Sequence, residues 1–102
     1  MSGYVLHPQA FNDLDDIWEF IAQDSLDAAD RVIEEIHGAI QSLVKIPGQG
    51  HSRTDLTSRP LRFWLVHSYL IAYAPEHPLV VIGVLHGRRN PKIMAAILRD
   101  RE

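Results

Sequence analysis

The hydrophobic pattern of this 102-residue chain changes its period once, and the change restricts the folds that the chain can adopt. Before Pro47 the apolar residues recur every three or four positions, which is typical of amphipathic helices. After Pro60 the segment LRFWLVHSYLIAYAPEHPLVVIGVLHG is rich in β-branched and aromatic residues, which favour strands. We therefore expect helices first and a sheet second, which is an α+β arrangement.

The residues before Pro47 predict a helical hairpin. Pro8 suits the first turn of a helix, and a stripe of apolar side chains follows it at helical spacing: Ala10, Leu14, Ile17, Trp18 and Ile21. The opposite, polar face carries Asp13, Asp16 and Glu19. Ser25 is a suitable N-cap for a second helix, which Pro47 ends. Because the link between the helices is short, we expect them to pack antiparallel.

The remaining residues complete a predicted single domain over residues 1–102. A short first strand is expected at 2–6, and turn-rich residues predict a loop over 47–60. Three later strands with short connections predict an antiparallel meander: 61–66, 69–74 and 79–86. Asn90 and Pro91 then predict the start of a short C-terminal helix. The expected fold is an N-terminal strand and a helical hairpin packed on a small, mostly antiparallel sheet, with a short helix at the end.

The composition excludes several kinds of site. The chain has no cysteine, which rules out disulfides and thiolate catalysis. No two of its six histidines lie four positions apart, and no HExxH or GxSxG motif is present, so we expect no metal, no other cofactor and no serine triad. The apolar runs are too short to cross a bilayer and no signal peptide is visible, so we expect a cytoplasmic protein.

The net charge of −3 conceals a strong asymmetry between the two halves. Residues 1–45 hold nine acids and two bases, whereas residues 46–102 hold eight bases and four acids. Strand alternation puts Arg62 and Trp64 on one face of the sheet, which we expect to be partly free. That face would form a basic, aromatic patch able to bind phosphates or stack on bases. Its expected border is Arg53, Arg59, Arg88, Arg89 and Lys92. The alternative is that these are ordinary surface arginines and a packing tryptophan.

RNA cleavage by attack of a 2′-hydroxyl is a second hypothesis for the same half of the chain. The reaction needs a base, an acid and cations that stabilise the charged phosphorane. The candidates for these roles are Arg62, Tyr73, His86, Arg88 and Arg89. The predicted sheet lacks an obvious general-base carboxylate, so the set is compatible with the chemistry without identifying it.

Five short motifs, spread over essentially the whole chain, carry a family resemblance. They are Ala10-x-x-Asp13-Leu14-x-x-Ile17-Trp18, Ala28-Ala29, Pro47-x-x-Gly50, Leu61-Arg62 and Val84-Leu85-His86-Gly87-Arg88-Arg89. In order and spacing they resemble the RelE/ParE superfamily of bacterial type II toxins. The sequence is most similar to the ParE branch, also called plasmid stabilisation proteins.

The resemblance implies a small toxin that a cognate antitoxin protein holds inactive. ParE-like members poison DNA gyrase without known catalytic residues, whereas RelE-like members cut messenger RNA in the ribosome. The Leu-His-Gly-Arg-Arg ending is more like the ParE branch, although Arg88 stands where that branch often has a small residue. The resemblance therefore favours inhibition of DNA gyrase. Ribosome-dependent RNA cleavage is the alternative, and a degenerate or antitoxin-bound protein with little toxicity is a third.

Two sets of contact residues follow from this interpretation. The residues expected to bind the target are Arg53, Arg59, Arg62, Trp64, His86, Arg88 and Arg89. Apolar side chains beside the helical stripes are expected to be exposed and to bind the antitoxin through a groove: Phe11, Trp18, Phe20 and Val44, with Tyr4 beside them. The alternative is that these apolar residues complete the core.

Overall fold

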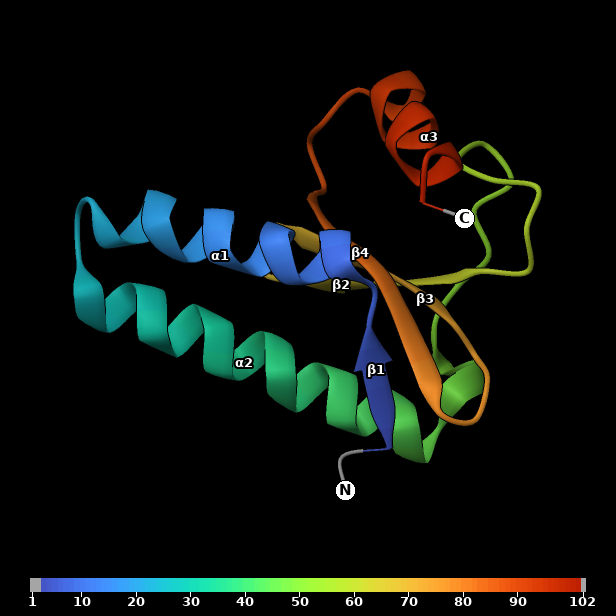
Figure 1. Ribbon diagram of the computed structural model, residues 1–102, viewed down its shortest axis with the longest axis horizontal. Coiled ribbons are helices and arrows are strands. Elements are labelled where there is room, and N and C mark those ends of the chain that lie inside the picture. The colour runs from blue at the N-terminus through green and yellow to red at the C-terminus, as the bar shows by residue number, and fades with distance from the viewer. Residues whose placement is uncertain (1–2, 102) are drawn as a thin grey trace.

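The elements expected from the sequence are present in the computed structural model, which describes residues 3–101 (Figure 1). In chain order they are β1 (Tyr4–Leu6), α1 (Pro8–Ala22), α2 (Leu26–Lys45), the short 3-10 helix η1 (Pro47–Gln49), β2 (Arg62–Val66), β3 (Tyr69–Ala74), β4 (Leu79–His86) and α3 (Pro91–Arg99). The prediction of an α+β fold is confirmed. Residue 2 of the predicted first strand lies outside the described residues.

Side-chain caps explain where the three α-helices begin. The ring nitrogen Nδ1 of His7 accepts a hydrogen bond from the Gln9 N–H at 3.0 Å, directly before Pro8 in the first turn of α1. Ser25 and Asn90 accept equivalent bonds at the starts of α2 and α3. Each cap satisfies a backbone donor that the first turn of a helix leaves without an intrahelical partner.

The sheet has the strand order β1-β4-β3-β2. The strands β2, β3 and β4 form the predicted antiparallel meander, and β1 joins β4 in parallel. The β1–β4 pairing runs only from Tyr4–Leu79 to Leu6–Val81, so β1 accompanies the first part of β4 alone. Opposite β3, the register shifts between Tyr73 and Ala72, which leaves Ile82 as an extra residue in β4.

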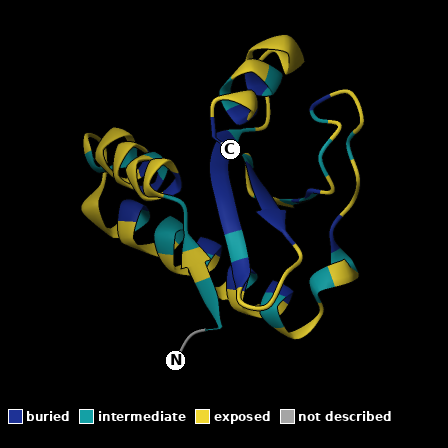
Figure 2. Cartoon of the chain, turned by 45° about the vertical axis from the view of Figure 1, so that its right-hand side comes forward, coloured by how far each residue is buried: buried dark blue, intermediate teal, exposed yellow. Residues whose placement is uncertain are grey.

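Both faces of the sheet are covered, so the expectation of a partly free face is wrong. The hairpin of α1 and α2 covers one face, where Ile71 and Val81 join a core with Ile36 and Ile40. On the other face, α3 and the loop before β2 bring Leu56, Met94 and Leu98 onto Leu70, Ala72, Ile82 and Leu85. Figure 2 shows the result: β4 is buried along most of its length, whereas the outer faces of the helices are exposed.

The covered face also changes the role of Trp64. Its side chain is half-buried, packs on the core beneath the hairpin and stacks on His51 with ring centroids 6.2 Å apart. The sequence pattern placed it on the correct strand and face, but that face is the one that the hairpin covers.

Candidate functional site

The predicted target-binding residues do not form one patch. His86, Arg88 and Arg89 lie together at the end of β4 and in the turn after it, where both arginines are exposed. Arg62 lies at the start of β2, and its Nη1 donates to the carbonyl oxygen of Gly50 at 2.8 Å. The two groups are therefore at opposite ends of the meander.

The loop arginines are engaged within the protein. Arg53 forms a two-point contact with Asp55, with its Nη2 2.8 Å from Oδ2 and its Nε 2.9 Å from Oδ1. This hydrogen bonding lowers the pKa of the Asp55 carboxyl and raises the pKa of Arg53. Arg59 donates to the carbonyl oxygen of Leu98 at 3.3 Å, at the end of α3. Arg59 thus helps to satisfy carbonyl groups that the helix end leaves open.

Tyr73 is a buried structural residue at the η1 end of the sheet. Its hydroxyl donates to the Pro47 carbonyl at 2.7 Å and accepts from the Gly50 N–H at 2.9 Å. Burial raises the pKa of this hydroxyl. Gly50 is required here, because a Cβ at that position would lie 2.5 Å from the Tyr73 oxygen.

The residues proposed for RNA cleavage are consequently not brought together. His86 pairs with Tyr69 at one end of β3, whereas Tyr73 lies four residues further along that strand. At ~3.3 Å per strand residue, this separates the two positions by about 13 Å. Arg62 pairs with Tyr73 and lies at the same distant end.

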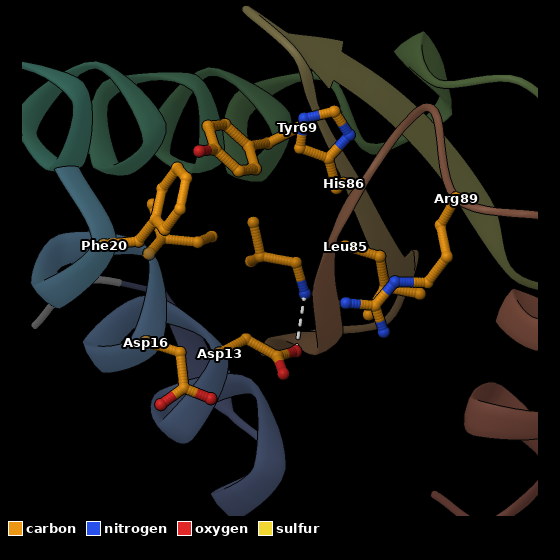
Figure 3. Close-up of a pocket in the computed structure, with 9 residues that line it drawn as sticks. Asp13, Asp16, Phe20, Tyr69, Leu85, His86 and Arg89 are labelled. Carbon is orange, nitrogen blue, oxygen red and sulfur yellow. Dashed lines mark hydrogen bonds between the residues drawn. The ribbon is translucent and has the colours of Figure 1, made fainter.

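A groove between α1 and the end of β4, here called the α1–β4 groove, collects several predicted residues (Figure 3). Its volume is about 360 Å³, and its lining is Asp13, Asp16, Ile17, Phe20, Tyr69, Val84, Leu85, His86 and Arg89. The ring of His86 meets Tyr69 edge-on, with centroids 5.5 Å apart and planes at 76°. The groove therefore combines an aromatic wall with a carboxylate of α1 on one side and a guanidinium of the β4–α3 turn on the other.

A buried ion pair joins Asp13, which lines the groove, to Arg101 near the end of the chain. Nη1 of Arg101 lies 2.5 Å from Asp13 Oδ2, and Nη2 lies 2.9 Å from Oδ1. The side chain of Arg101 is only 10% exposed and that of Asp13 only 14%. The Asp13 carboxylate also accepts the Val84 N–H at 2.9 Å, and Arg101 Nη1 donates to the Ile82 carbonyl at 3.3 Å.

Sequence reasoning missed this ion pair and assigned Asp13 to the polar face of its helix. The available signal was Gly83, a glycine inside an apolar strand, which often marks a close approach. A Cβ at Gly83 would lie 2.5 Å from Arg101 Nη1 and 3.3 Å from the Asp13 carboxylate. Gly83 therefore provides the space in which the ion pair packs on β4.

The predicted antitoxin-binding residues divide into three locations. Phe20, 69% exposed, lines the α1–β4 groove. Phe11, 56% exposed, and Trp18, 36% exposed, line a second hollow of about 180 Å³ beside α1 and α2. The expectation that Val44 is exposed is wrong, because it packs on the hairpin core and would contact a Cβ at Gly3 at 2.8 Å.

Within residues 3–101, no helix combines the length and apolar character needed to span a bilayer. Across this described range, no three His, Asp or Glu side chains gather in an arrangement that could hold a metal ion.

Comparison with known proteins gave one family. A family model described as ParE toxin of type II toxin-antitoxin system, parDE, matches residues 4–91. No curated protein matches the chain. The matched segment includes the hairpin, the whole sheet and the residues of the α1–β4 groove, whereas Arg101 and α3 beyond Pro91 follow it.

Proposed function

Because this chain belongs to the ParE toxin family of type II toxin-antitoxin systems and is a toxin of that kind, we propose that it inhibits DNA gyrase and is neutralised by a cognate antitoxin. The observation that carries the choice of target is the separation of Tyr73 from His86 along β3. Acid–base catalysis needs its groups within hydrogen-bond reach of one reacting centre. A toxin that acts by binding has no such requirement.

The surface proposed to contact gyrase is the end of β4 with the turn that follows it. His86, Arg88 and Arg89 are adjacent there, and both arginines extend into solvent. Exposed cations of this kind suit an acidic protein surface or nucleic acid phosphates. Both proposed targets, gyrase and the ribosome, act in the cytoplasm, and we place the toxin there.

The antitoxin is proposed to cover the exposed apolar side chains of α1. Large exposed apolar residues such as Phe11 and Phe20 are a common mark of a protein-binding surface. Trp18 adds a hydrogen-bonded aromatic ring, because its indole N–H donates to Asp30 on α2 at 2.9 Å. The proposed antitoxin contact therefore includes two flanks of α1, one beside β4 with Phe20 and one beside α2 with Phe11 and Trp18.

Ribosome-dependent cleavage of messenger RNA is the alternative function. The observation in its favour is that His86 lies beside Tyr69 and next to two exposed arginines, which together offer a titratable ring and cations. This smaller group does not include Tyr73 or Arg62.

Two assays run on the same purified toxin separate the mechanisms. The first follows supercoiling and DNA cleavage by gyrase, and the second follows cleavage of messenger RNA in programmed ribosomes. We expect gyrase inhibition that survives His86→Gln, falls when Arg88→Ala and Arg89→Ala are combined, and is retained in the control Arg31→Ala on α2. RNA cleavage without gyrase inhibition would refute the proposal.

A further inference from the structure

The loop before β2 encloses a hollow that is separate from the α1–β4 groove. This hollow, here called the loop pocket, has a volume of about 270 Å³ and is lined by residues of the loop, by the start of β2 and by Pro75 after β3. Its lining includes Arg53, Arg59 and Arg62, and no Asp or Glu of residues 3–101 lines it. The loop pocket therefore collects positive charge from three side chains.

Two of these arginines carry charges that no ion pair balances. Arg53 is paired with Asp55, whereas Arg59 and Arg62 form no ion pair with a carboxylate among residues 3–101. Both side chains are half-buried. A guanidinium group stays charged in proteins, and burial removes part of the water that stabilises its charge. An anion in the loop pocket would supply the missing negative charge.

Internal hydrogen bonds fix these arginines and leave donors unused. Nη1 of Arg59 donates to the Leu98 carbonyl at 3.3 Å, and Nη1 of Arg62 donates to the Gly50 carbonyl at 2.8 Å. The Nε and Nη2 groups of both have no hydrogen-bond partner among residues 3–101. A guanidinium group held in place with free N–H donors is preorganised for a two-point contact with an oxyanion.

Hydroxyl groups add further donors to the loop pocket. Within residues 3–101, the hydroxyls of Ser52, Thr54 and Ser58 have no hydrogen-bond partner. The Thr57 oxygen accepts the Arg59 N–H at 3.1 Å, which leaves its own hydrogen able to donate. Donors that approach from several sides suit the tetrahedral oxygens of a phosphate better than the planar oxygens of a carboxylate.

An adjoining hollow of about 150 Å³ extends the site towards α3. It shares Thr57, Ser58 and Arg59 with the loop pocket and adds Arg99. Arg59 is therefore common to both hollows, and each hollow has at least one other arginine. This arrangement suits a ligand with two linked phosphates better than a single phosphate ion.

We propose that the loop pocket and its neighbour bind the diphosphate group of a small ligand. Arg59 and Arg62 would bind one phosphate, and Arg59 with Arg99 would bind the other. A nucleic acid strand is the less favoured ligand, because it needs a groove that tracks its backbone, whereas Arg59 and Arg62 are half-buried in a hollow. The site goes beyond gyrase inhibition, since it lies at the opposite end of the meander from His86.

The test is calorimetric titration of the purified toxin with inorganic pyrophosphate, phosphate and ADP. Pyrophosphate is expected to bind more tightly than phosphate, because only a diphosphate reaches both hollows. ADP tighter than pyrophosphate would assign the source of the diphosphate to a nucleotide, and the reverse order would assign it to the free anion. Pyrophosphate binding that is absent, or no tighter than phosphate binding, would overturn the proposal.

Two variants and a control connect binding with the proposed residues. Arg62→Ala should weaken pyrophosphate binding about 10- to 100-fold, through loss of charged hydrogen bonds. Because it also frees the Gly50 carbonyl, a second variant combines Thr54→Val with Ser58→Ala, whose hydroxyls have no partner within residues 3–101, and should weaken binding ~2- to 10-fold. The control Arg31→Ala removes the same charge from an exposed site on α2 and should leave the affinity unchanged.

NMR of the wild-type toxin locates the ligand without any variant. Pyrophosphate should shift the amide signals of residues 52–62 and leave those of residues 86–89 in place. Shifts confined to residues 86–89, or equal affinities in all three variants, would refute the loop pocket as the site. Displacement of pyrophosphate by an equal concentration of single-stranded DNA would also overturn the proposal, in favour of a nucleic acid site. None of these results depends on whether the toxin inhibits gyrase.

Discussion

The ion pair of Asp13 and Arg101 gives the most direct test of how the C-terminal residues hold the fold together. Arg101→Ala would leave the Asp13 carboxylate, which is 14% exposed, with the Val84 N–H as its only hydrogen-bond donor among residues 3–101. Removal of one partner from a buried pair costs about 3–5 kcal/mol. Because both side chains retain slight exposure, we expect the lower end, about 3 kcal/mol.

The assay is unfolding by urea and by heat, followed by circular dichroism. A loss of about 1 kcal/mol lowers the Tm of a domain of this size by ~4–8 °C, so Arg101→Ala should lower it by about 12–24 °C. Arg99→Ala is the matched control, because Arg99 is an exposed arginine two residues earlier in the chain. That variant should change the unfolding free energy by no more than about 0.5 kcal/mol.

A double-mutant cycle isolates the contribution of the pair from the loss of each side chain. Asp13→Ala and Arg101→Ala together should destabilise the toxin by less than the sum of the single changes, by about 1–3 kcal/mol. Equal effects of Arg101→Ala and Arg99→Ala, or additive effects in the cycle, would refute the assignment of a stabilising buried pair. If Arg101→Ala is destabilising and the cycle is non-additive, then Arg101, which lies beyond the segment matched by the family model, stabilises the edge of the sheet.

Two further predictions concern a buried hydroxyl and an exposed ring. Tyr73→Phe should lower the unfolding free energy by about 1–3 kcal/mol, because the Gly50 N–H loses its acceptor. Because burial raises the pKa of Tyr73, its contribution to stability is fully present below about pH 10, the pKa of tyrosine in the unfolded chain. That contribution is lost as pH rises through the pKa of Tyr73 in the folded protein. Tyr73→Phe should not show this alkaline loss in urea titrations. Phe20→Ser should weaken antitoxin binding measured by calorimetry, while the free energy of unfolding changes by no more than about 0.5 kcal/mol. The control is Leu26→Ser, at an exposed residue outside the α1–β4 groove, which should leave antitoxin binding unchanged.

The α1–β4 groove connects the stability of the toxin with its proposed regulation. The ion pair of Asp13 and Arg101 binds two backbone groups of β4, the Val84 N–H and the Ile82 carbonyl. An exposed strand edge is a site where another chain readily pairs. Occupation of the groove by the antitoxin would place the antitoxin close to His86 and Arg89, which belong to the proposed target surface.

Local features of the sequence determined the elements of this protein. The helical spacing of Ala10, Leu14 and Ile17 predicted the buried face of α1, and Ser25 and Asn90 predicted where α2 and α3 begin. Residues close in sequence create these signals, through caps and repeated apolar positions. The order and type of the elements, and the family resemblance that their motifs carry, were therefore readable without coordinates.

Only the tertiary structure decided which surfaces remain exposed. Alternation assigned Trp64 to a face of its strand, but which layer covers that face depends on how the hairpin packs. Asp13 has the local appearance of a solvent-facing helix residue, and its partner Arg101 lies 88 positions away. Among residues 3–101, β1 pairs with β4 only as far as Val81, because the chain then enters α1. Burial, ion pairs and uncovered sheet edges depend on contacts between residues that are far apart in the sequence. The local hydrophobic pattern does not specify which distant residues come into contact.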